Sequence, residues 1–172
     1  PVNPGTRCLK RATRMARYRN ACREAIVNRY ANDFTHVILV DTDLGVRGWS
    51  YDGIANTFGW SGWDSVGSIG IKFLRSYRGE KNRPVHFDVW AFRWAEGCKP
   101  VMAYQINPRG WARGESIVKL NSCFGGMGIY KMAEMQQWRY DGSDCEHVPF
   151  HRGKEKAGFG NRFMNPSQFC VY

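Results

Sequence analysis

His36-Val37-Ile38-Leu39-Val40-Asp41-Thr42-Asp43 is the stretch from which the fold can be inferred. Residues 36–40 are mostly β-branched or apolar and predict a buried β-strand, and two carboxylates follow where that strand ends. In open α/β sheets, ligands bind beyond the carboxyl ends of the strands. We therefore expect Asp41 and Asp43 to hold a hard divalent cation and, through it, a phosphate-bearing ligand. The alternative is a strand that ends in an Asx-turn, with the second Asp solvated.

A basic segment precedes this strand. Residues 7–32 predict a long helix, because they lack Pro and place apolar residues at helical spacing. Arg14, Arg19 and Asn20 lie on this helix, and arginine can bind phosphate oxygens or base edges bidentately. The alternative for each basic residue is a solvated surface charge. The expected apolar face comprises Leu9, Ala12, Met15, Ala16, Cys22, Ile26 and Tyr30.

The remaining segments suit an α/β domain. A helix that leads into a strand with acids at its tip is the α/β pattern. No segment resembles a linker, so we expect a single domain over residues 1–172. The other predicted elements are a short helix at 51–57, strands at 65–71, 117–124 and 145–150, a glycine turn at 125–128, a strand passing into a helix over 129–138, and a final apolar run at 163–172.

Acids and histidines gather in Asp144-Cys145-Glu146-His147, with His151 close behind. In an extended strand, Glu146 would face one side of the sheet, and both histidines would face the other. One histidine could complete a metal site that begins at Asp43, and one of the two acids could act as general base on a hydroxyl acceptor. The alternative is a histidine that is hydrogen-bonded at the end of a strand.

Glycines at 125, 126 and 128 form a further motif. Gly125 and Gly126 would allow a ligand to approach the backbone closely. No GK[ST] follows them, and the GxGxxG spacing fails, so the motif is neither a Walker loop nor a dinucleotide fingerprint. The alternative is a tight turn from a strand to a helix.

Composition limits the classes of protein to consider. With 172 residues, 43% of them hydrophobic, the chain suits a globular domain, and without a run of 18 apolar residues we expect no membrane span. The net charge of +10 favours polyanions, anionic surfaces or phosphorylated small molecules as partners. The six cysteines show no CxxC spacing, which argues against a zinc knuckle or a thioredoxin motif, and we interpret several as buried free thiols.

Together these segments resemble a GT-A type glycosyltransferase. Asp41-Thr42-Asp43 resembles its DXD motif, and Arg14…Arg19-Asn20 is similar to the "R…A..RN" helix that precedes that motif. The later similarities are those of residues 87–93 to a "yD.wa.R" segment, 122–126 to "SCw.G", 143–147 to "SEC.h" and Asn165-Pro166 to the "NP" that follows. Their order is similar to that in the fungal capsule-associated mannosyltransferase group and in related domains of large DNA viruses, and it covers residues 7–172.

The resemblance implies a fold, a reaction and a set of roles. The fold would be α/β, with a mixed, mostly parallel central sheet flanked by helices, as in Rossmann-like nucleotide-sugar-binding domains. The reaction would transfer a sugar from a UDP- or GDP-sugar to a glycan hydroxyl, with Mn²⁺ or Mg²⁺ as cofactor. The implied roles are donor binding by Arg14, Arg19, Asn20, Asp41, Thr42, Asp43, Gly125 and Gly126, metal binding by Asp41, Asp43 and His151, and catalysis on the acceptor side by Glu146 or Asp144.

The chain departs from this family in two respects. It begins almost at the helix before the acidic strand, so the first strand, which would hold the base, is not visible, and we expect the chain to be a fragment of a longer one. The segment Asp144-Cys145-Glu146-His147 also stands where the group has Glu-Cys, which leaves open which acid would act.

Two other functions use the same residues. A nucleic-acid-binding module would suit the charge and the interleaved aromatics, but much of the basicity lies in one helix and no RNP, KH or zinc-finger pattern occurs. A metal-dependent nucleotidyl- or phosphotransferase would need a further carboxylate, which Asp64 or Asp88 could supply. The sequence leaves open the sugar, the acceptor, the stereochemical outcome, the oligomeric state and the compartment.

Overall fold

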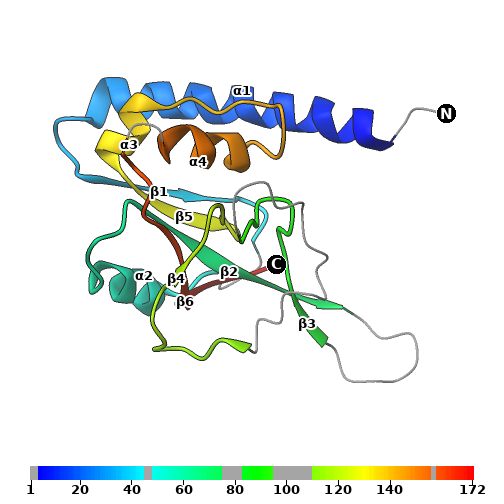
Figure 1. Ribbon diagram of the computed structural model, residues 1–172, viewed down its shortest axis with the longest axis vertical. Helices are drawn as coiled ribbons and strands as arrows, with labels where there is room; N and C mark the ends of the chain where they lie inside the picture. The colour runs from blue at the N-terminus through cyan, green and yellow to red at the C-terminus, as the bar shows by residue number, and fades with distance from the viewer. Residues whose placement is uncertain (1–3, 45–47, 75–82, 95–109, 156–157) are drawn as a thin grey trace.

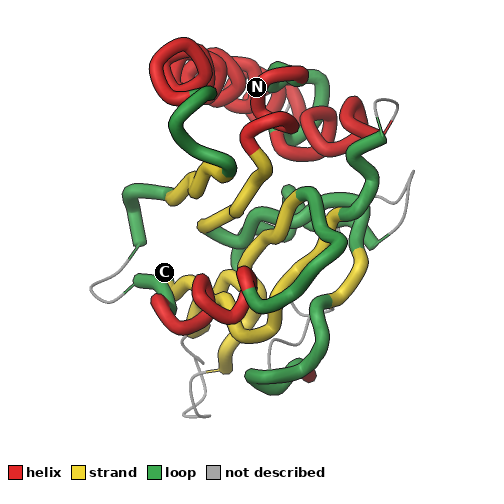
Figure 2. The backbone as a smooth tube through the Cα atoms, turned by 90° about the vertical axis from the view of Figure 1, so that its left-hand side faces the viewer, coloured by secondary structure: helices red, strands yellow, loops and turns green. Residues whose placement is uncertain are grey.

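The computed structural model describes residues 4–44, 48–74, 83–94, 110–155 and 158–172, which form a β-sheet with helices on both faces (Figure 1). The helices α1, α3 and α4 lie together on one side of the strands, and α2 lies on the other (Figure 1 and Figure 2). The elements in chain order are α1 (Pro4–Tyr30), β1 (His36–Val40), α2 (Tyr51–Phe58), β2 (Ser65–Leu74), β3 (Arg83–His86), β4 (Val118–Lys119), β5 (Met127–Lys131), α3 (Met132–Gln137), α4 (His147–Glu155) and β6 (Arg162–Val171).

The sheet is mixed, with the strand order β1-β5-β2-β6-β4 and with β3 paired to β2 off this path. Among the strand pairs of the described residues, β2 with β6 is parallel and the others are antiparallel. The expected α/β class with a mixed sheet is therefore confirmed, whereas the expectation of a mostly parallel sheet is wrong. The cause lies at the tip of β1, where the Asp41 amide donates to the Gly126 carbonyl at 2.9 Å. Because β5 starts beside the end of β1, the two strands pair in the antiparallel direction.

Most of the predicted elements are present. β1 covers the predicted strand at 36–40, but only Val37 in it is buried and Ile38 is exposed, so the expectation of a buried strand is wrong. α1, α2 and β2 match the predictions at 7–32, 51–57 and 65–71 with shifted ends. The prediction of a strand passing into a helix over 129–138 corresponds to β5 followed directly by α3. The strand predicted at 117–124 is reduced to the two residues of β4.

The strand predicted at 145–150 is wrong, because α4 begins at His147. The carboxylate of Asp144 accepts a hydrogen bond from the amide of Cys145 at 2.7 Å just before this helix. Pro149 is the third residue of α4, and the first N–H groups of a helix have no intrahelical partner, so the proline costs no hydrogen bond there. In a helix, His147 and His151 lie on one face, and their ring centroids are 6.1 Å apart.

Helix α1 packs on the sheet through a face that differs from the expected one. Ala12 and Ala16 are buried as predicted, but Cys22 is exposed and Arg23 is buried in its place. The Nη2 atom of Arg23 donates to the carbonyl of Gln136 in α3 at 2.6 Å. The helix therefore turns part of its basic residues toward the protein rather than toward water.

The core lies on both faces of the sheet. Between the sheet and the helices α1, α3 and α4, Tyr130, Tyr140 and Phe150 are buried together, and the last two stack with a centroid distance of 4.0 Å. On the α2 side, Ile129 of β5 is buried in a second cluster, against which Ile54 of α2 packs. Strand β5 therefore carries core side chains on both of its faces.

A bulge in β6 is fixed by side-chain hydrogen bonds. Asn165 pairs with Ser68 of β2, but residues 166–168 are left out of the ladder before pairing resumes. Asn165 Nδ2 donates to Thr57 Oγ1 at 2.8 Å, Thr57 donates to Gln168 Oε1 at 2.7 Å, and Gln168 Nε2 donates to Ser68 Oγ at 2.8 Å. All four side chains are buried, so this network ties α2 to both strands and sets the register of β6.

Two expectations from composition can be compared with the structure. Within the described ranges, no helix has the length and apolarity needed to cross a membrane. Cys123 and Cys170 are buried free thiols, as predicted for several cysteines, whereas Cys22 is a free thiol on the surface.

Replacing Gly125 tests the turn that brings β5 to the tip of β1. Gly125 has a φ of 62°, and an added Cβ would overlap the carbonyl oxygen of Ser68. A left-handed conformation costs an L-residue about 1–2 kcal/mol, so with the overlap we expect Gly125→Ala to lower the free energy of unfolding by about 3 kcal/mol or more in urea titrations. Gly62→Ala is the control, because Gly62 has a φ of 78° but no neighbouring atom, and we expect a loss of only about 1 kcal/mol. Equal losses would contradict the role of the overlap.

Candidate functional site

The site is built around Asp41, at the tip of β1. Arg19 Nη2 donates to one carboxylate oxygen of Asp41 at 3.1 Å, and the hydroxyl of Tyr172 donates to the other at 2.9 Å. The two residues that follow, Thr42 and Asp43, are exposed. The acidic motif therefore divides into one aspartate that is held by the protein and one that is open to solvent.

Arg19 joins this strand tip to the segment before α4. Its Nε donates to Glu146 Oε1 at 3.0 Å, so a single guanidinium binds two carboxylates. Its Cζ lies 4.8 Å from the ring centroid of Phe124, and the ring of His147 stacks on that of Phe124 at a centroid distance of 4.0 Å. Burial opposes the charge of Arg19, but Tyr140, Asp41 and Glu146 raise its pKa above the ordinary value, so the side chain stays cationic.

Asp88 is a third carboxylate at this place. It has a φ of 62°, a conformation that non-glycine residues rarely adopt, and its Oδ2 accepts a hydrogen bond from the Gly125 amide at 3.2 Å. Burial, together with the negative charges of Asp41 and Glu146, raises the pKa of Asp88 to about 7. The site thus combines one arginine with three acids, one of which titrates near neutrality.

The glycine turn is packed against the protein's own atoms. Gly126 has a φ of 92°, and a Cβ on it would lie 2.6 Å from the hydroxyl of Tyr172. A Cβ on Gly125 would lie closer still to the protein, at the carbonyl oxygen of Ser68. The close approach that these glycines permit is therefore made by Ser68 of β2 and by Tyr172 just after β6. The glycines form a tight turn, but it leads into strand β5 and not into a helix.

Asp144 has a different environment from Glu146. Arg93 Nη2 donates to both of its carboxylate oxygens, at 3.2 and 3.1 Å. Arg93 itself is buried, and its Nη1 donates to the carbonyls of Trp90 and Phe92. Asp144 therefore anchors the 88–93 turn, while Glu146 is the member of this acidic segment that reaches Arg19.

His151 lies in the core and not beside Asp43. It is 2% exposed, its Nδ1 is 2.8 Å from Ser122 Oγ, and its ring lies parallel to Tyr130 at a centroid distance of 5.9 Å. Within the described part of the chain, no three His, Cys, Asp or Glu side chains are grouped so as to hold a metal ion. The structure thus does not bring the three expected metal ligands together.

The remaining residues expected to bind the donor have separate positions on α1. Arg14 is exposed. Asn20 exchanges two hydrogen bonds with the backbone of Tyr140, as donor at 2.8 Å and as acceptor at 2.7 Å. This amide anchors the segment between α3 and α4 to α1, next to Arg19, and so it positions the site.

The donor set at the strand tip suits magnesium or manganese better than a metal that requires a cage of protein ligands. Mg²⁺ commonly binds one or two carboxylates and takes its other ligands from water and substrate phosphates. Asp43 offers an open carboxylate, and Asp41 a partly exposed one that already accepts two hydrogen bonds. The two acids therefore fit a cation that arrives together with a phosphate ligand.

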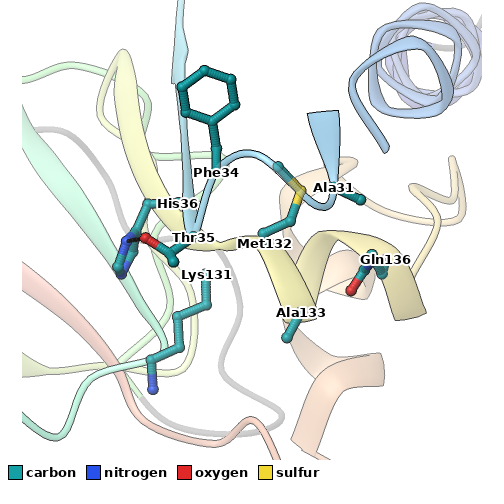
Figure 3. A pocket seen from close by; sticks show the side chains of 8 residues that line it. All are labelled: Ala31, Phe34, Thr35, His36, Lys131, Met132, Ala133 and Gln136. Carbon is teal, nitrogen blue, oxygen red and sulfur yellow. Dashed lines mark hydrogen bonds between the residues drawn. The ribbon is translucent and has the colours of Figure 1, made fainter. Parts of the chain in front are cut away.

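A separate cavity of about 380 Å³ lies at the opposite end of β1. Residues from the end of α1, the start of β1 and α3 line it, among them Phe34, His36, Lys131 and Gln136 (Figure 3). It contains none of the three acids, so it is not part of the site at Asp41.

Comparisons with known proteins give little further information. No protein-family model matches the chain, and neither does a curated protein. Among solved structures, the chain is similar to the one titled "Crystal Structure of A197 from STIV", with 13% sequence identity and a TM-score of 0.49. The similarity covers 90% of this chain and 64% of the other, and a similarity of this size supports no inference about function.

Asp88→Asn tests the electrostatics of the site. Because the pKa of Asp88 is raised on folding, the folded state binds more protons than the unfolded state between about pH 4 and pH 7, and this carboxyl lowers stability as the pH rises through that range. Asparagine tolerates a positive φ and does not ionise. We therefore expect Asp88→Asn to gain stability relative to wild type between pH 4.5 and pH 7.5 in urea titrations.

Asp33→Asn, at an exposed position, is the control. Its free energy of unfolding should differ from that of wild type by the same amount at each pH in this range. A stability difference between Asp88→Asn and wild type that does not change with pH would contradict the raised pKa of Asp88.

Proposed function

We propose that this chain is a metal-dependent glycosyltransferase that transfers a sugar from a nucleoside diphosphate sugar to a hydroxyl acceptor. The observation that carries the proposal is the meeting of Asp41 and Glu146 on one guanidinium, that of Arg19. The strand tip that resembles a DXD motif and the distant segment that resembles "SEC.h" thus meet at one place. The helix with the "R…A..RN" similarity supplies the residue that joins them.

Each residue of this place has a role under the proposal. Bound at Asp43 and Asp41, Mn²⁺ or Mg²⁺ would neutralise the diphosphate and stabilise it as a leaving group. Arg19 lies next to Asp41 and can bind phosphate oxygens bidentately. Thr42 lies between the two acids on the exposed side. The glycines at 125 and 126 shape the turn that holds Asp88 in place.

Glu146 and Asp88 are the candidates for proton transfer from the acceptor hydroxyl. Glu146 is preferred over Asp144, because Glu146 shares Arg19 with Asp41, whereas Asp144 is bound on both oxygens by Arg93. Asp88 adds a carboxyl whose pKa, about 7, is suited to a general base near neutral pH. His151 has no part in this assignment, since it is buried against Ser122 and Tyr130.

A nucleotidyl- or phosphotransferase is the second candidate, and Asp88 is the observation that favours it. Of the two acids expected to supply a further carboxylate, Asp64 binds Lys131 at 2.9 Å, whereas Asp88 interacts electrostatically with Asp41. A nucleotidyltransferase would release pyrophosphate from a nucleoside triphosphate, and a phosphotransferase would turn such a triphosphate into a nucleoside diphosphate. A glycosyltransferase releases the nucleoside diphosphate from a nucleotide sugar instead, so the donor consumed and the product released together separate the functions.

Donor binding is the direct test of the first function. We expect calorimetry to show that a UDP- or GDP-sugar binds only with Mn²⁺, and that Asp43→Ala weakens this binding at least about tenfold, because an open carboxylate ligand is lost. Asp33→Ala removes another exposed aspartate, just before the other end of β1, and should leave binding unchanged.

An opposite outcome would favour nucleic-acid binding. The exposed Arg14, Arg17 and Arg29 could serve that function, although Arg19 and Arg23 are engaged within the protein. Tight, salt-sensitive oligonucleotide binding that Asp43→Ala leaves intact, with no binding of nucleotide sugars, would overturn the proposed transferase.

A further inference from the structure

The guanidinium of Arg19 lies between the carboxylates of Asp41 and Glu146. Its Nη2 and Nε atoms lie 3.1 and 3.0 Å from the two carboxylates. The side chains of Arg19, Asp41 and Glu146 are only 15%, 26% and 10% exposed, so water screens these contacts weakly. The two acids thus share one positive charge, which the chain itself supplies.

Both carboxylate oxygens of Asp41 already accept a hydrogen bond. Arg19 donates to Oδ1 and Tyr172 to Oδ2, and an ionised carboxylate has lone pairs left on each oxygen. A metal ion could therefore still approach Asp41, but it would do so beside a fixed positive charge. Because like charges repel, a guanidinium and a divalent ion that both contact Asp41 would each weaken the binding of the other to it.

The charges of the site nevertheless favour a stronger cation than arginine. Asp41, Glu146 and Asp88 together bring up to three negative charges against the one positive charge of Arg19. A divalent ion would supply more positive charge than the guanidinium does. Arg19 would in turn give up its carboxylates and its contact with Phe124, and its guanidinium would become available to phosphate oxygens.

We propose that Arg19 is the resident cation of this site and that a divalent metal ion binds Asp41 only by displacing it. The inference rests on the proposed function, because it concerns the metal that this function requires. It makes Arg19 a residue that sets metal affinity: two ion pairs have to break before the metal binds, and the released guanidinium then faces the donor. Metal binding and donor binding are thereby coupled through one side chain.

The binding of Mn²⁺ alone, followed by electron paramagnetic resonance, tests this competition. Arg19→Gln removes the charge and should bind Mn²⁺ about tenfold more tightly than wild type or better. Arg17→Gln removes an exposed charge from the same helix, two residues away, and should bind like wild type. A wild type that binds Mn²⁺ as tightly as, or more tightly than, Arg19→Gln overturns the inference, while manganese-dependent donor binding by that wild type leaves the proposed function intact.

Arg19→Gln also loses two ion pairs that hold α1, so a measurement on the wild-type chain is needed beside it. Titration with Mg²⁺ can be followed by the NMR signal of the arginine Nε–H groups. We expect the Arg19 signal to shift and to exchange faster with water once its bond to Glu146 breaks. Mg²⁺ that binds at Asp41 without moving this signal overturns the inference, even if the variant does not fold.

Discussion

The contact of one guanidinium with two carboxylates is the interaction on which the arrangement of this protein depends. Arg19 stands on α1, Asp41 at the end of β1 and Glu146 just before α4, so three elements meet at one side chain. Removing one partner of a buried ion pair leaves the other without compensation, which is why such a cluster fixes geometry strongly. Around it, Asn20 holds the Tyr140 backbone and Phe124 lies against the guanidinium.

Much of the fold could be predicted, because several elements carry strong local signals. Residues 37–40 are apolar, three of them β-branched, and two acids follow; the strand forms over the predicted residues 36–40. The prediction of a strand at residues 145–150 is wrong, because this segment has no regular alternation of apolar and polar residues. Its proline also suits the first turn of a helix as well as a bend. The direction of the strands depends on where the turn at Gly125 and Gly126 meets Asp41, and that contact is not local in sequence.

The candidate site was predictable to a smaller extent. Asp41 and Glu146 were identified by their acidic neighbours, and they do share Arg19. Asp88 received no role beyond that of a spare carboxylate, because its importance comes from a positive φ and from the charges that surround it in space. The sequence gives no sign of the role of Tyr172, since an isolated tyrosine carries no motif. The burial of Arg23 could not be predicted either, because nothing distinguishes it in sequence from the solvated arginines of the same helix.

The bulge in β6 fixes the register of this strand and so the face to which each later side chain points. Side chains alternate between the two faces of a strand, so a slip of one residue would turn every later side chain to the opposite face. The hydrogen bonds among Thr57, Asn165 and Gln168 prevent such a slip, and the count from Asn165 onward then places the hydroxyl of Tyr172 at Asp41. The buried hydrogen bonds between α2 and β6 thereby determine where Tyr172, which donates to Asp41, is placed.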